Sequence, residues 1–93
     1  MLVHYLPDVK QSKEHEALQR AIEGYYPEQY DEWRSHQSEA ITKLAARGDE
    51  VRLVEVTAAE FVDYCKRTGV RCDITAFTGF LWDKGKRSKA KNT

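Results

Sequence analysis

Apolar positions in the first half of the chain predict one short strand followed by two helices. Residues 2–6 are largely apolar on both alternating faces, which is typical of a strand covered on both sides or of one whose edge is shared with a second subunit, and Pro7 is expected to end it. Apolar residues at helical spacing then predict a helix over 12–23. A longer seam, with spacings of three and four residues, predicts a second helix over 28–47 that ends at Gly48. The two helices are therefore expected to cross over between this strand and the next.

The second half of the chain is organised around a junction between a strand and a helix. Residues 51–56 form a β-branched run, which predicts a central strand. Thr57 and Glu60 have the spacing of a capping box, in which two side chains satisfy backbone N–H groups at the start of a helix. The strand is thus expected to pass into a helix over 57–68 within one or two residues.

The end of the chain is predicted to hold one more helix and a basic tail. Residues 70–72 are either a very short third strand or an extended linker, and Asp73 is expected to begin the last helix. Residues 85–93 include no large apolar side chain, so we predict a disordered tail there. The folded domain is then expected to span 1–84.

These elements predict an α+β fold with the order β-α-α-β-α-(β)-α, in which four helices surround a small sheet of two or three strands. A chain of 93 residues is enough for one such domain. An isolated pair of strands is only marginally stable, so we expect a homodimer that forms either through a shared sheet or through the surplus aromatic side chains.

The net charge is zero, but the two halves of the chain differ in sign. Residues 1–50 carry six basic and ten acidic side chains, a sum of −4, whereas 51–93 carry nine basic and five acidic side chains, a sum of +4. Much of the positive excess lies near the C-terminus, in Lys84, Lys86, Arg87, Lys89 and Lys91. These five side chains are candidates for binding a nucleic-acid backbone without sequence specificity.

The predicted helix pair over 58–84 has the order of a DNA-binding helix–turn–helix, whose second helix would begin at Asp73. That second helix has no Arg or Lys before Lys84, and its acidic first residue would meet the phosphates. Nucleic-acid binding through the helix pair and the basic tail is therefore an alternative to the leading prediction given below.

The chain offers few groups for catalysis or metal binding. They are two cysteines and three histidines: Cys65, Cys72, His4, His15 and His36. The cysteine spacing is not that of a zinc knuckle, the histidines are scattered, and the sequence contains no nucleophile elbow or glycine-rich phosphate loop. His15 lies between Glu14 and Glu16 and is predicted at the surface. We therefore predict no catalytic residue, no metal and no cofactor, and leave open a small enzyme in which these groups converge in space.

Aromatic side chains give the leading functional prediction. The chain has ten of them, more than so small a domain easily buries, and aromatic residues are enriched at protein interfaces. The candidates for a partner-binding surface are Tyr26, Tyr30, Trp33, Phe80 and Trp82. We predict a small non-enzymatic interaction module or regulator whose partner is another protein or a second copy. No apolar run of about 18 residues and no signal peptide occur, so we expect a cytoplasmic protein without membrane contact.

Overall fold

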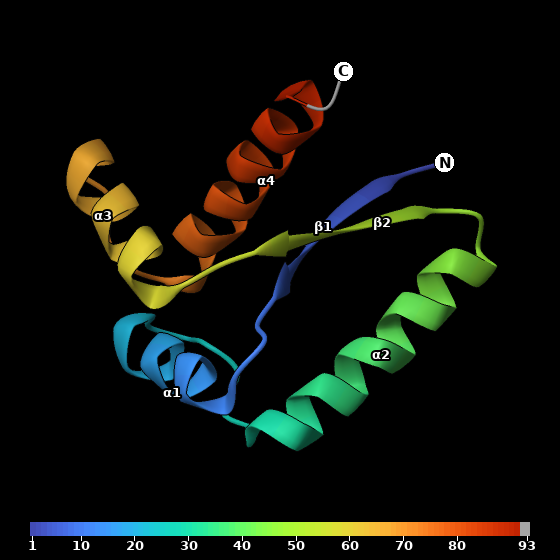
Figure 1. Cartoon of the computed structure of the whole chain (residues 1–93), viewed down its shortest axis with the longest axis horizontal. Helices are drawn as coiled ribbons and strands as arrows, with labels where there is room; N and C mark the ends of the chain where they lie inside the picture. Colours follow the sequence, from blue (N-terminus) through green and yellow to red (C-terminus); the bar gives the residue numbers. More distant parts are fainter. Residues whose placement is uncertain (92–93) are drawn as a thin grey trace.

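Two parallel strands and four helices make up the fold, and the predicted α+β class is confirmed (Figure 1). The computed structural model describes residues 1–91, and side chains for residues 1–87. In chain order the elements are β1 (Val3–Asp8), α1 (Ser12–Ala21), α2 (Tyr30–Ala46), β2 (Glu50–Glu55), α3 (Ala58–Thr68) and α4 (Ile74–Lys91). No helix within residues 1–91 is both long enough and apolar enough to cross a membrane.

The two strands pair in parallel along their whole length, from Val3 beside Glu50 to Asp8 beside Glu55. A parallel pair needs a long connection, and here α1 and α2 supply it. In Figure 1, α4 lies on one side of the strands and α2 on the other. Helix α4 packs against both strands, whereas side chains of α2 reach the outer edge of β1.

The hydrophobic core lies where the carboxyl half of the sheet meets α1, α3 and α4. Its centre is Phe61 of α3, which is fully buried and meets Phe77 and Phe80 of α4 at ring-centroid distances of 5.2 and 5.5 Å. Val54 and Val56 enter this core from the end of β2. The opposite face of the sheet is less covered: Leu53 of β2 is 53% exposed, and Leu2, which directly precedes β1 on the same face, is 58% exposed.

Thr57 caps α3 as predicted, but one half of the expected capping box forms: the Glu60 carboxylate accepts from the Thr57 hydroxyl at 3.4 Å instead of from its backbone N–H. The Glu60 backbone N–H donates to Thr57 Oγ1 at 3.1 Å, which satisfies one of the free donors of the first turn. The helix ends at Gly69, which adopts the left-handed conformation with φ +71°. Asp73 likewise accepts from the Ala76 backbone N–H at 2.9 Å, as expected of the residue that begins α4.

The strand β1 differs from its prediction because it continues through Pro7 to Asp8. Proline is tolerated at this position because its nitrogen points away from β2, toward the outer edge of the sheet. Residues 70–72 do not form a strand. Instead the Cys72 carbonyl accepts from the Glu23 N–H at 2.9 Å, which gives a single bridge rather than a third strand.

The C-terminal segment also differs from its prediction. Residues 85–91 continue α4, where the sequence had predicted a disordered tail. Gly85 is buried against the ring of Tyr5, which leaves no space for a Cβ atom. The remaining residues of that predicted tail, 92–93, lie outside the described part of the chain.

Candidate interaction surfaces

The pairing of the two strands determines which backbone groups point outward. Glu50 N–H donates to the Leu2 carbonyl at 2.8 Å, and Val56 N–H donates to the Asp8 carbonyl at 3.4 Å. Successive residues of a strand direct their N–H and C=O groups alternately to its two sides. Even-numbered residues therefore face the other strand, and odd-numbered residues face the outer edge. On β2 the outward residues are Val51, Leu53 and Glu55.

The outer edge of β2 is largely open. Within residues 1–91, one hydrogen bond reaches its outward backbone groups, from Lys84 Nζ to the Glu55 carbonyl. The N–H and C=O groups of Val51 and Leu53 have no partner in the same part of the chain. The Leu53 side chain, 53% exposed, adds an apolar surface at the centre of this edge. This is the type of edge on which another strand can pair.

The outer edge of β1 is protected by α2. Pro7 presents no N–H group, and its carbonyl accepts from Gln37 Nε2 at 2.7 Å. The Val9 carbonyl accepts from the Tyr30 hydroxyl at 2.6 Å and from Arg34 Nη1 at 3.3 Å. Three side chains of one helix thus occupy the acceptors at the carboxyl end of this edge.

The five predicted partner-binding aromatics do not share one surface. Trp33 is 4% exposed and Phe80 is 3% exposed, so both belong to the core. Tyr30 is half-buried and uses its hydroxyl on β1. Tyr26 and Trp82 are 41% and 48% exposed, but Tyr26 contacts Tyr25 and Trp33 whereas Trp82 contacts Tyr5. Only these two of the five therefore present a large part of the ring to solvent.

The basic residues of α4 also have different surroundings. Lys84 Nζ forms an ion pair with Glu60 at 2.7 Å and also donates to the Glu55 carbonyl, so it is bound within the protein. Lys86 Nζ lies 5.4 Å from the centre of the Trp82 ring, and Arg87 is exposed. The side chains of Lys89 and Lys91 lie outside the described part of the chain. Trp82 and Lys86 thus form an exposed aromatic and basic pair.

The surface position predicted for His15 is wrong, because this side chain is 1% exposed. Its ring lies among Tyr25, Tyr30 and Trp33 at centroid distances of 5.5, 5.7 and 5.1 Å. His15 Nε2 is 2.8 Å from the Glu28 carbonyl, while Nδ1 has no partner within the described residues. Helical spacing alone could have predicted the buried position of His15, since it shares a helix face with the buried Leu18 and Ile22.

The other two histidines lie on separate acidic partners. His4 Nε2 is 3.0 Å from Asp49 Oδ2, and the Leu2 N–H donates to the other oxygen of Asp49 at 3.1 Å. These hydrogen bonds lower the pKa of the Asp49 carboxyl group, and the one with His4 has the largest effect. His36 is exposed and 3.5 Å from Glu28. The three histidines therefore do not converge, and residues 1–91 contain no cluster of three metal-ligating side chains.

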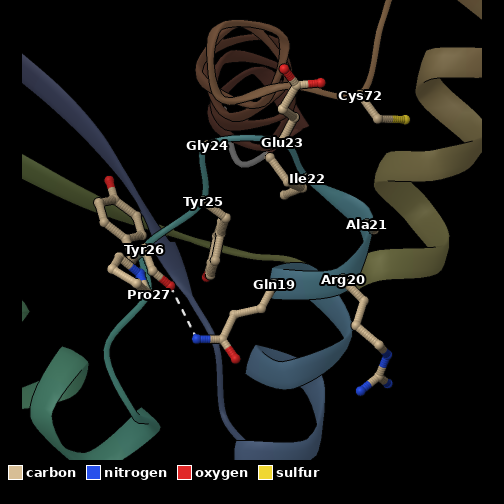
Figure 2. Close-up of a pocket in the computed structure, with 10 residues that line it drawn as sticks. All are labelled: Gln19, Arg20, Ala21, Ile22, Glu23, Gly24, Tyr25, Tyr26, Pro27 and Cys72. Carbon is tan, nitrogen blue, oxygen red and sulfur yellow. Dashed lines mark hydrogen bonds between the residues drawn. The ribbon is translucent and has the colours of Figure 1, made fainter.

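Three depressions in the surface carry polar groups, and one of them, of about 610 Å³, lies between α1 and the start of α2 with the buried His15 in its lining. Another, of about 640 Å³, lies beside the α1–α2 loop and includes Gln19, Tyr26 and Cys72; its Gln19 amide donates to the Tyr26 carbonyl at 3.1 Å (Figure 2). His36 and Glu39 do not line it.

The third depression, of about 260 Å³, lies at the carboxyl ends of the two strands. Lys10 in its lining is paired with Asp8 and, at 3.1 Å, with Glu55, while Glu14 accepts from the Ala58 N–H.

Comparisons with known proteins do not add to this geometry. No protein-family model matches the chain, and no curated protein or solved structure matches it. We therefore infer function from the surfaces and contacts of the chain itself.

Proposed function

We propose that this protein is a non-enzymatic interaction module that associates with a second copy through the outer edge of β2. The observation that carries the proposal is the open row of backbone groups at Val51 and Leu53 beside an exposed Leu53 side chain. Two strands alone make a marginal sheet, and a strand added at an edge brings main-chain hydrogen bonds together with apolar contact.

A two-fold axis at Leu53 gives this association a closed geometry. Two β2 strands related by such an axis run antiparallel, so the outward groups of Leu53 meet those of its own copy. Val51 then lies opposite Glu55 of the partner copy on both sides of the axis. The result is a four-stranded sheet with β1 at each end, where α2 already protects the carboxyl part of the edge. The assembly therefore stops at two copies.

Apolar contact on one sheet face supports the same arrangement. Leu6 and Leu53 are register partners, and alternation along each strand puts Leu2 on their face. Leu2 and Leu53 are both more than half exposed in the single chain. Pairing of two β2 strands brings the two Leu53 side chains together at the axis on one face of the sheet, so apolar area is buried in addition to the new hydrogen bonds.

Light scattering across a dilution series tests the proposal. At about 100 μM we expect a dimer that dissociates on dilution, because association depends on concentration. Leu53→Lys places a charge at the axis and should give a monomer. Val70→Lys is the matched control, since Val70 is another exposed apolar residue, 43% exposed, in the loop after α3. A monomeric parent protein, or equal effects of both variants, contradicts the proposal.

A second function, binding of single-stranded nucleic acid, is favoured by one observation. The exposed Trp82 ring has Lys86 over its face and the exposed Arg87 next along the helix. Bases stack on such rings while nearby cations contact the phosphates. Insertion of α4 into a DNA groove is less well supported, because the start of this helix is covered by the α1–α2 loop. The Ile74 N–H donates to the Glu23 carbonyl, and Gly24 packs on the Ile74 side chain.

Fluorescence anisotropy with a short single-stranded oligonucleotide tests this second function. We expect salt-sensitive binding that is lost on Trp82→Ala and weakened by Lys86→Glu. Tyr26→Ala is the control, because Tyr26 is the other exposed ring of the predicted set. Absence of binding at about 50 mM salt, where phosphate contacts are strong, removes this candidate.

A further inference from the structure

The two cysteines of the chain are brought together by the turn that follows α3. Cys65 lies in the last turns of α3, faces the core and is 4% exposed. The chain reverses at Gly69, and the N–H groups of Gly69 and Val70 both donate to the Cys65 carbonyl, at 2.9 and 3.2 Å. This folds the following residues back over the turn that holds Cys65.

Cys72 stands on the accessible side of the same region. It is half-buried, packs against the core and lines the depression of about 640 Å³ beside the α1–α2 loop. Its carbonyl accepts from the Glu23 N–H, which anchors the backbone. In Figure 2 its sulfur points toward α3, the helix that carries Cys65.

The surroundings of the two thiols differ in a way that gives them different roles. Burial, followed by the interaction with Cys72, raises the pKa of Cys65 to about 12. Cys65 is therefore a poor first nucleophile and is out of reach of a reagent in solution. Cys72 opens onto the depression beside the α1–α2 loop, and its thiol is in hydrogen-bonding contact with that of Cys65.

We propose that Cys65 and Cys72 form a dithiol site that closes to an intramolecular disulfide by exchange with a low-molecular-weight disulfide. The Cys72 thiolate attacks one sulfur of the small disulfide, forming a mixed disulfide and releasing one thiolate, which takes up the proton that Cys72 has lost. The Cys65 thiolate then attacks the Cys72 sulfur and displaces the second small thiolate, which takes up the Cys65 proton. One protein dithiol and one small disulfide thus give one protein disulfide and two small thiols.

The closed form ties the end of α3 to the segment that pairs with Glu23. In the reduced form this segment is held by one bridge to the α1–α2 connection and by the turn at Gly69. A covalent link fixes Cys72 against α3 and so fixes one wall of the depression beside the α1–α2 loop. The substrate class is a small disulfide, with oxidised glutathione as the probe.

Intact-mass spectrometry of the full chain after incubation with oxidised glutathione tests the proposal. We expect the parent protein to pass through a mixed disulfide and to end about 2 Da lighter than the reduced chain, because two hydrogens are lost. Cys65→Ala should stop at the mixed disulfide on Cys72. Cys72→Ser should stay unmodified while folded, since Cys65 is buried. Circular dichroism of each variant verifies that it is folded before the comparison is made.

Tryptic mapping without reduction identifies the bond. Lys66, Arg67 and Arg71 lie between the two cysteines, so trypsin releases Cys65 and Cys72 on different peptides. The closed form therefore gives a pair of linked peptides from one chain that separates on reduction. A stable mixed disulfide in the parent protein, a bond between two chains only, or no reaction overturns the proposal. None of these outcomes depends on pairing at β2, because both variants retain Leu53.

Discussion

The two edges of the sheet are built from similar strands but meet solvent differently. On β1, Pro7 removes a donor, and Gln37 and Tyr30 reach across from α2 to occupy two carbonyls. On β2, the groups of Val51 and Leu53 are left open within the described residues, and the Leu53 side chain is 53% exposed. Folded proteins ordinarily shield their strand edges, because an open edge invites another strand. The contrast teaches that one edge is closed within the chain, while the other is suited to a partner.

The largest expected effect comes from removing the donor at the centre of the open edge. Leu53→Pro deletes an N–H group that points away from β1, so the pairing of β1 with β2 keeps its hydrogen bonds. Two hydrogen bonds across the proposed axis are lost, at about 0.5–1.5 kcal/mol each, and the dimer dissociation constant should rise roughly 100-fold or less.

Sedimentation velocity measures this change, and Leu53→Val is the control because it keeps the N–H group. A proline variant that is folded and dimerises as tightly as the parent would show that another surface is used.

A smaller effect is expected from uncovering the protected edge. Gln37→Ala removes a donor to the Pro7 carbonyl and Tyr30→Phe one to the carbonyl of Val9, directly after β1, so each should lower the free energy of unfolding by about 1 kcal/mol. Urea denaturation at fixed protein concentration gives the values. Gln29→Ala is a suitable control, because the Gln29 side chain makes no capping hydrogen bond to α2. Equal stability of Gln37→Ala and Gln29→Ala would remove the protective role of Gln37.

The smallest effect concerns the amino end of the sheet, where Asp49 links both strands. Hydrogen bonds from His4 and from the Leu2 N–H hold the pKa of Asp49 below its ordinary value of 3.8. The stabilisation is complete well above pH 3.8 and is lost as the pH falls through the lowered pKa. Asp49→Asn should therefore be less stable than the parent at pH 7, and the two should converge in acid. Parallel stability curves across that range would contradict this account.

Local patterns in the sequence account for much of the fold. The seam of α2 and the N-cap at Thr57 depend on residues within a few positions of one another, and both elements occur where they were predicted. The end of β1 was misplaced because Pro7 is excluded from a strand interior but tolerated on an outer edge. Which edge a strand occupies is a property of the whole sheet and cannot be derived from the strand alone.

Long-range contacts account for the features that the sequence did not reveal. His15 is flanked by two acids yet is buried, because the α1–α2 loop brings three aromatic rings around it. Trp33 and Phe80 were predicted on a surface, but the same packing buries them. The open edge of β2 was equally hidden, since it depends on where the side chains of α2 reach. Only the expectation that a two-stranded sheet needs completion pointed toward it.

The contact of Gly85 with Tyr5 has a consequence for the order in which the chain can fold. Tyr5 belongs to the first strand to be synthesised, its neighbour β2 follows only after two helices, and the residue that packs on its ring comes near the end of α4. The earliest strand is therefore among the last to be enclosed. Because the pairs that enclose it are so distant in sequence, we expect folding to be slower than in a helical bundle of this length.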